Sequence, residues 1–165
     1  MTRVQRLTRL LILTLLGTLL FASKFVLQHL PNIEIVSLLL LVYTRKFGAW
    51  TFIPVYIFVG LEIAIYGINI WNIMYLYVWS ILVLVCLPLK KFKASWLFAL
   101  ISGAFGLLFG VLCSIPYFFG MGPEFALSWI ISGLPFDAVH GGGNFLLTLL
   151  LYTPLSAALD RAVKN

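Results

Sequence analysis

Charged side chains are scarce in this chain of 165 residues: they make up 10% of it, while 62% of the residues are apolar. A soluble domain typically has about a quarter of charged residues, which cover its surface in water. Too few charges are present here to cover such a surface, and the mean hydropathy of +1.09 agrees. We therefore predict an integral membrane protein, folded as one domain over residues 1–165 without a sizeable soluble part.

Motifs that would indicate catalysis, a metal site or a nucleotide are also missing. The sequence has no CxxC, no HExxH, no phosphate-binding loop and no nucleophile–base pair at a recognisable spacing. Cys86 and Cys113 lie inside apolar runs, so we expect packed thiols rather than a disulfide or metal ligands. We predict no enzymatic activity, no cofactor and no metal. The net charge of +6 is scattered over four segments, which favours anionic lipid headgroups over nucleic acid as partners.

Six apolar runs predict an all-α protein with six transmembrane helices in one compact bundle. The runs are Leu10–Leu27, Ile33–Tyr43, Trp50–Ile70, Ile73–Leu89, Ser95–Phe119 and Pro135–Leu155. Most of them have close to the roughly 20 residues that cross a bilayer. Ile33–Tyr43 is only about 16 Å long as a helix, which implies a thinned bilayer face at that point.

The basic residues predict the orientation in the membrane. With six crossings, ten of the eleven Lys and Arg residues fall on one side: Arg3, Arg6, Arg9, Arg45, Lys46, Lys90, Lys91, Lys93, Arg161 and Lys164. A second segment that turned back would move seven of the ten to the other side. Because basic residues favour the cytoplasm, we predict a multi-pass protein of the cell (plasma) membrane with both termini cytoplasmic. The N-terminus resembles a signal peptide but has no small-x-small cleavage site, so we expect it to stay as the first helix.

Polar and aromatic side chains recur on one face of each of three predicted helices. These nine residues are Glu62, Tyr66 and Asn69 on the third helix, Asn72, Tyr75 and Trp79 on the fourth, and Asp137, His140 and Asn144 on the sixth. In the predicted orientation all three stripes open toward the outside. Because ionisable residues inside a membrane are costly, we take the nine as candidate substrate-binding residues that line one pocket.

Several of these residues also have a plain structural interpretation. Asp137 closely follows Pro135, as acids do in the first turn of a helix, and Glu62 fits a protonated carboxyl bonded to a neighbouring helix. Tyrosine and tryptophan gather at membrane interfaces in any case, and Trp71 is most simply such a residue. We expect Lys24 to extend its ammonium group to the lipid headgroups rather than to bind a ligand.

Small residues spaced by four predict close helix contacts on two helices. They are Thr14, Thr18 and Ala22 on the first helix, and Ser102, Gly106, Gly110 and Ser114 on the fifth. Each stripe either packs inside the bundle or faces another protein. The run Gly141–Gly143 in the sixth helix likewise indicates that another helix or a ligand approaches closely.

The chain resembles the substrate-binding S components of energy-coupling-factor (ECF) vitamin importers over nearly its whole length. The resemblance rests on size, on six helices with both ends inside, and on three local matches. The matches are Leu30–Glu34 at the start of the short second helix, Tyr75–Trp79 on the fourth, and Gly133–Asp137 followed by His140 and Asn144 on the sixth.

This resemblance implies capture of a water-soluble vitamin or related micronutrient in an outward-facing pocket. It also implies docking on a scaffold membrane protein driven by two cytoplasmic ATPases. S components often dock through an Ala-x-x-x-Ala motif on the first helix, where this chain has Thr14, Thr18 and Ala22. These three are therefore the expected docking residues.

The residues leave the ligand and two other functions open. Aromatic faces with two acids suit a planar heterocycle, cationic or not, such as a vitamin B6 form, a thiamine precursor or a deazapurine base; a cobalamin-type ligand stays open. One alternative function is a stand-alone secondary transporter or channel, although no inverted repeat or paired broken helices are present. The other is an intramembrane enzyme that uses Glu62, Asp137 and His140.

Overall fold

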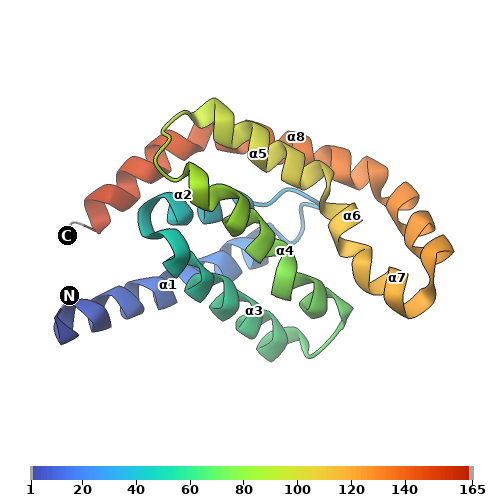
Figure 1. The fold of residues 1–165 in the computed structure, drawn as a ribbon, viewed down its shortest axis with the longest axis horizontal. Helices are drawn as coiled ribbons and strands as arrows, with labels where there is room; N and C mark the ends of the chain where they lie inside the picture. Colours follow the sequence, from blue (N-terminus) through green and yellow to red (C-terminus); the bar gives the residue numbers. More distant parts are fainter. Residues whose placement is uncertain (1, 164–165) are drawn as a thin grey trace.

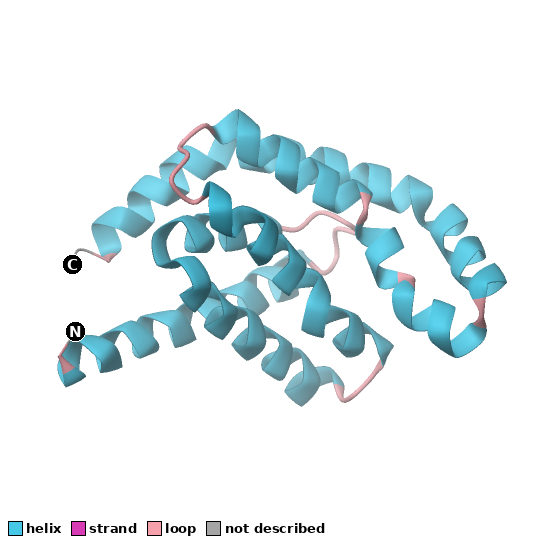
Figure 2. Cartoon of the chain, viewed as in Figure 1, coloured by secondary structure: helices cyan, strands magenta, loops and turns pink. Residues whose placement is uncertain are grey.

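The computed structural model describes residues 2–163, and within them every regular element is a helix (Figure 2). The elements are α1 (Arg3–Leu27), α2 (Val36–Phe47), η1 (Gly48–Thr51), α3 (Phe52–Tyr66), α4 (Ile70–Cys86), η2 (Leu87–Leu89), α5 (Ser95–Leu107), α6 (Phe109–Cys113), α7 (Ile115–Met121) and α8 (Pro123–Ala162). The prediction of an all-α chain is confirmed for this part of the protein.

Several helices are long and apolar enough to span a membrane. Four continuous helical stretches in the described residues qualify: α1, α4 with η2, α8, and the stretch Val36–Tyr66 that holds α2, η1 and α3. A fifth results if α5 and the α6–α7 segment form one span, bent by 47°. The predicted second and third helices thus share one stretch that stays helical through η1, although the chain changes direction there (Figure 1).

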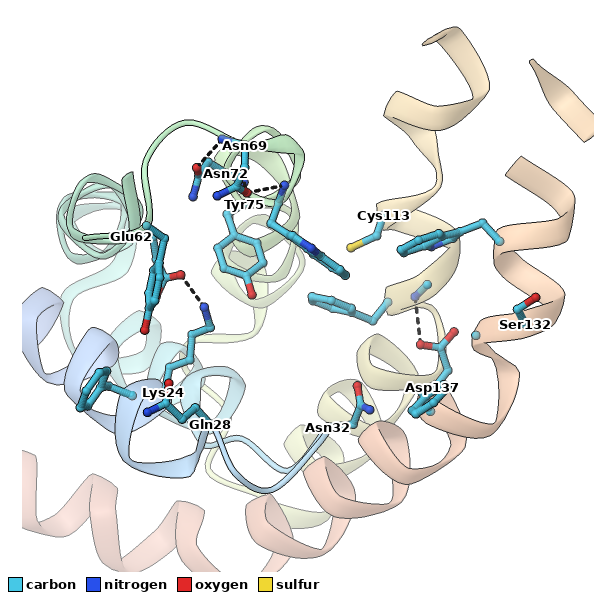
Figure 3. Close-up of a pocket in the computed structure, with 18 residues that line it drawn as sticks. Lys24, Gln28, Asn32, Glu62, Asn69, Asn72, Tyr75, Cys113, Ser132 and Asp137 are labelled. Atoms are coloured by element: carbon cyan, nitrogen blue, oxygen red, sulfur yellow. Dashed lines mark hydrogen bonds and ion pairs between the residues drawn. The ribbon is translucent and has the colours of Figure 1, made fainter. Parts of the chain in front are cut away.

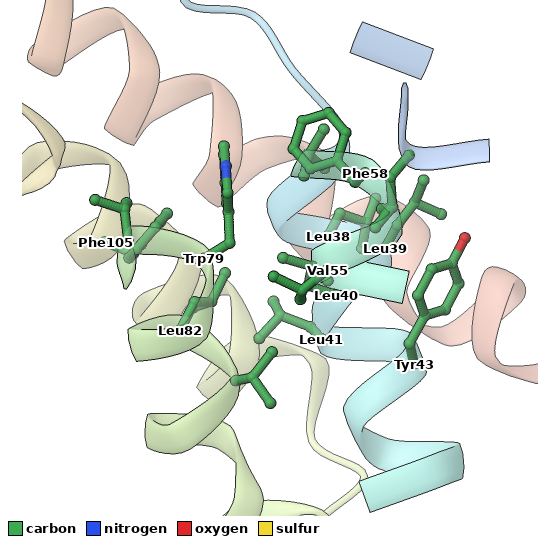
Figure 4. Close-up of a cluster of buried hydrophobic side chains, with 14 of the residues drawn as sticks. Leu38, Leu39, Leu40, Leu41, Tyr43, Val55, Phe58, Trp79, Leu82 and Phe105 are labelled. Atoms are coloured by element: carbon green, nitrogen blue, oxygen red, sulfur yellow. The ribbon is translucent and has the colours of Figure 1, made fainter. Parts of the chain in front are cut away.

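The helices form two outer pairs with two inner helices between them (Figure 1). α5 lies along α8 on one side, and α1 lies along α3 on the other. Between these pairs, α2 contacts both α8 and α4, and α4 also contacts α3. The buried apolar core gathers around α2, where Leu38–Leu41 meet Val55, Phe58, Trp79 and Leu82 (Figure 4).

Three helices begin earlier than their apolar runs predict, α4 by three residues and the other two by seven or more. α1 begins at Arg3, because Thr2 and Gln5 close a capping box: the Gln5 N–H donates to Thr2 Oγ1 at 3.2 Å, and the Thr2 N–H donates to Gln5 Oε1 at 2.8 Å. α8 begins at Pro123, and so the expected helix start at Pro135 is wrong. Pro135 lies inside a helix of 40 residues, which membrane helices tolerate when neighbouring groups bond the freed carbonyls.

The positions at which helices end also differ from the prediction. Gly67 (φ +73) ends α3, and Asn69 caps α4 by accepting the N–H of Trp71 at 3.0 Å. The spacing of Asn69 from Glu62 suggested that both lie on the third helix. In the structure Asn69 instead caps the start of α4. The predicted fifth helix breaks at Leu108 into α5 and α6.

Glycine residues bring α5 and α8 together. A Cβ atom on Gly106 would lie 2.7 Å from the backbone of Gly141, which explains the small residue at both positions. The small-residue stripe on the fifth helix therefore packs inside the bundle, and the close approach predicted for Gly141–Gly143 is made by a helix. Gly142, by contrast, has no other atom within 4 Å of the place that its Cβ would take.

Both ends of the described chain lie at the same end of the molecule (Figure 1). Arg45 and Lys46, at the end of α2, pair with Asp160 near the end of α8 at 2.6 and 3.2 Å. The Arg9 guanidinium lies over the Trp50 ring at 5.7 Å. These contacts join α1, α2 and α8 at the end of the molecule that we call the basic end.

The glycine contact between α5 and α8 predicts opposite effects for two alanine substitutions. Gly106→Ala should lower the free energy of unfolding by about 1–3 kcal/mol, because the new methyl group meets only backbone atoms that cannot yield. Gly142→Ala is the matched control and should be neutral or stabilising by up to about 1 kcal/mol, since it gains helix propensity in open space. Thermal unfolding of the purified variants in detergent measures both; equal effects would contradict this packing.

Candidate functional site

A cavity of about 740 Å³ lies where α1 and α3 end and α4 begins, and Figure 3 shows the side chains that line it. Sites for small molecules typically have about 300–1,000 Å³. The walls come from the end of α1 and the connection after it, the end of α3, the start of α4, α6 and the N-terminal third of α8. Four separate segments of the chain, residues 24–32, 62–75, 109–113 and 129–137, thus surround one space of the right size for a small molecule.

An ion pair forms one side of this cavity. The Lys24 ammonium on α1 donates to Glu62 Oε2 on α3 (Figure 3). The ammonium also lies 5.6 Å from the Tyr66 ring centre and 5.0 Å from that of Tyr75, where the ring faces attract a cation. The expectation that Lys24 extends to the headgroups is therefore wrong. Glu62 does bond to a neighbouring helix, as expected, and its partner there is the Lys24 ammonium.

Asp137 lies on the opposite side of the cavity, on α8 (Figure 3). One carboxyl oxygen, Oδ1, accepts the backbone N–H of Gly110 at 3.1 Å. That N–H is free because the helix breaks at Leu108, so Gly110 lies in the first turn of α6, where amides have no partner within the helix. The other oxygen, Oδ2, is shielded from solvent and has no hydrogen-bond partner in the described part of the chain.

The expectation that Asp137 sits at a helix start is thus corrected. It lies 14 residues after Pro123, where α8 begins, and the amide that it accepts belongs to another helix. Asp137 is only 6% exposed, and no Lys or Arg of the described residues pairs with it. The carboxyl is therefore held in place by one neutral donor and lacks a cationic partner.

Aromatic rings line the space between the two sides. Tyr75 stacks on Phe58 at 5.8 Å between ring centres. Trp71 and Trp129, from α4 and α8, approach to 5.9 Å. Both tryptophans line the cavity, so Trp71 is more than a residue of the membrane interface. Phe109 lies edge-on to the His140 ring at 4.8 Å. A planar ligand would meet ring faces on several sides.

A second cavity of about 240 Å³ adjoins the first. The two share part of their lining: Lys24, Gln28, Asn32, Tyr75 and Phe109. Glu34 and His140 lie on the smaller one, with Glu34 Oε1 3.2 Å from His140 Nε2. Glu34 also accepts the N–H of Ser37 at 2.8 Å. The Trp79 indole N–H faces no acceptor among residues 2–163.

The structure brings most of the nine candidate residues to these cavities. Six line the larger one: Glu62, Tyr66, Asn69, Asn72, Tyr75 and Asp137. Trp79 and His140 line the smaller one. Asn69 and Asn72 also have a structural role, since their side chains complete the capping box of α4.

Asn144 does not line either cavity. It is 2% exposed, and its Nδ2 donates to Ser37 Oγ at 3.1 Å. This bond links α8 to α2 one turn of helix beyond His140. In the structure Asn144 joins two helices, and its contact with a ligand stays a prediction.

Some lining residues escaped the sequence analysis. Gln28 and Asn32 lie in the connection between α1 and α2, where no helical spacing reveals which side chains share a face. Trp129 and Ser132 lie in the first turns of α8, which the apolar pattern did not include. Lys24 carried a signal, because it was the only basic residue that the predicted topology left off the cytoplasmic side.

The first-helix stripe faces outward. Thr14, Thr18 and Ala22 are exposed in the described structure, and the two threonine hydroxyls bond to carbonyls of their own helix at 2.9 and 3.1 Å. The side of α1 that packs on α3 carries Gly17 instead, where an added Cβ would lie 2.8 Å from Ile57. The stripe is thus free to contact lipid or another protein.

The Lys24–Glu62 pair predicts non-additive effects on stability. Lys24→Met should lower the free energy of unfolding by about 1–3 kcal/mol, because Glu62, itself 3% exposed, would keep a buried charge without a cation. This range allows for Lys24 being a third exposed. Adding Glu62→Gln to Lys24→Met should restore at least about 1 kcal/mol. Thermal unfolding of the two single variants and the double variant tests this, and strictly additive losses would contradict the pair.

No protein-family model, curated protein or solved structure significantly matches this chain. The basis for a functional proposal is therefore the cavity and its side chains. Within residues 2–163, no three His, Cys, Asp or Glu side chains are grouped so that they could hold a metal ion. The cavity offers instead one ion pair, one carboxyl group without a cationic partner, several amides and a set of aromatic faces.

Proposed function

We propose that this chain is the substrate-capture (S) component of an ECF-type importer in the cell (plasma) membrane. In this role it binds a water-soluble vitamin or related micronutrient and delivers it by docking on a scaffold membrane protein with two cytoplasmic ATPases. The observation that carries the proposal is the cavity of about 740 Å³, where polar and aromatic side chains from helices far apart in sequence meet. The sequence resemblance to S components supports the same function.

We infer six crossings with both ends in the cytoplasm. The basic end holds Arg9, Arg45 and Lys46 beside the two ends of the chain. The cavity lies at the opposite end, where α1 and α3 end and α4 begins. Basic residues favour the cytoplasmic side, and this rule supports a cavity that faces outward to collect its ligand. The change of direction at η1 allows α2 and α3 to be two crossings (Figure 1).

The energy for uptake would come from the partner proteins, since the sequence contains no phosphate-binding loop. The exposed stripe of Thr14, Thr18 and Ala22 is the proposed docking surface. Small residues let two helices approach closely in lipid, where van der Waals packing replaces the hydrophobic effect as the main attraction. Because these residues lie on the face of α1 away from α3, docking there would leave the bundle unchanged.

Reconstitution separates this proposal from a stand-alone transporter. Proteoliposomes with this chain alone should bind the ligand but not accumulate it. Accumulation should require the scaffold, both ATPases and ATP, because no element of this chain couples to an energy source. Radiolabelled uptake measures the difference, and concentrative uptake by the chain alone would refute the S-component assignment.

Two variants at Thr18 test the docking surface in the same experiment, one disruptive and one as its control. Thr18→Leu should weaken assembly with the scaffold at least about tenfold, because bulk at a small-residue seam forces the backbones apart. Ligand binding should be retained, since Thr18 does not line either cavity. Thr18→Ser, which keeps the residue small, should assemble normally. Loss of binding with assembly intact would contradict the proposed docking surface.

A further inference from the structure

The charges on the two cavities are unequal. Their lining contains one lysine, Lys24, and no arginine, against three carboxyl groups, Glu34, Glu62 and Asp137. With every carboxyl ionised the lining has a net charge of −2, which becomes −1 if the His140 imidazole is protonated. The described lining therefore has an excess of negative charge in either state.

The three carboxyl groups differ in what neutralises them. Glu62 has the Lys24 ammonium, and Glu34 has His140 and the Ser37 N–H. Asp137 has the Gly110 N–H alone, and its second oxygen has no partner among residues 2–163. A buried charge costs much free energy unless it is paired as well as hydrogen-bonded. Of the three, Asp137 is the carboxyl group that has no cationic partner within residues 2–163.

We propose that the ligand is a planar heterocyclic monocation and that Asp137 is its counter-ion. This inference rests on the proposed function as a capture protein and specifies the ligand class. A donor N–H of the cation would pair with the Asp137 carboxylate while the ring lies against Phe109 and Trp129, which also line the cavity. Carboxylate pairing and a ring face under a cation reinforce each other where water is excluded.

The other side of the cavity disfavours anions. A carboxylate or phosphate ligand would need a free cation, and the Lys24 ammonium is already bonded to Glu62 and lies over the rings of Tyr66 and Tyr75. Binding an anion there would break that pair and leave Glu62 buried without a partner, which is costly. The Lys24–Glu62 pair thus disfavours the binding of anions, while the Glu62 carboxyl group still lines the cavity and can orient the ligand.

Three isosteric probes of different charge test the ligand class without knowledge of the natural ligand. Benzamidine is a planar cation at neutral pH, benzamide is its neutral counterpart and benzoate is the anion. Their binding to the full-length protein in detergent can be followed by tryptophan fluorescence, because Trp71 and Trp129 line the cavity. We expect benzamidine to bind with a Kd of about 1 mM, at least about tenfold tighter than benzamide, with benzoate weakest.

Variants assign that preference to one residue. Asp137→Asn should weaken benzamidine binding at least about tenfold, to the level of benzamide, because the amide keeps the shape but loses the charge. Glu124→Gln, an exposed acid on the same helix, is the matched control and should leave all three affinities unchanged. A benzamidine preference that survives Asp137→Asn would overturn the assignment of the counter-ion.

The wild-type series decides the ligand class even if Asp137→Asn does not fold. Equal affinity for the three probes, absence of benzamidine binding up to about 10 mM, or tighter binding of benzoate would each overturn the cation proposal. Failure here is distinguishable from failure of the S-component assignment, which rests on uptake with partner proteins. A cation preference together with uptake by the chain alone would uphold this inference and refute the proposed function.

Discussion

The cost of a charge inside a membrane protein is the constraint on which this architecture depends. Water and its counter-ions are absent there, so each buried carboxyl needs a partner of its own. Glu62 obtains one from Lys24, on a helix distant in sequence. Asp137 obtains a single amide from α6 and no cation from residues 2–163. The first carboxyl stabilises the fold by joining α1 to α3, and the second is the one that we propose as the counter-ion of a ligand.

The packing of α5 against α8 determines where that second carboxyl lies. Gly106 and Gly141 let the two backbones approach, and this contact sets the position of the α8 face that carries Asp137. The helix break at Leu108 then directs α6 away from α5. It also leaves the Gly110 N–H free to donate a hydrogen bond to the Asp137 carboxyl group. A continuous fifth helix would have used this amide in its own ladder. The bend between α5 and α6 therefore also supplies the N–H donor that positions the Asp137 carboxyl group beside the cavity.

The helical class and the residues around the cavity were largely predictable, because apolarity marks membrane helices and a spacing of three or four marks a shared face. Helix boundaries were not, since a proline shortly after a glycine is typical of a helix start, yet α8 runs from Pro123 through both Gly133 and Pro135. Periodicity also does not tell which helix a face meets. Asn144 shares a stripe with His140 and yet meets Ser37 on α2. The Lys24–Glu62 pair could be identified only from the three-dimensional arrangement. The sequence showed only that Lys24 lies apart from the other basic residues.

The central claim is that the cavity captures a small cation through Asp137. Mass spectrometry tests it most directly, on small molecules released by denaturing the full-length protein after purification in mild detergent from its native membranes. The account predicts a planar heterocycle that carries a positive charge, present in near-stoichiometric amount and lost from Asp137→Asn protein. A stoichiometric anionic or aliphatic ligand, or the same cation retained in full by the Asp137→Asn protein, would contradict it.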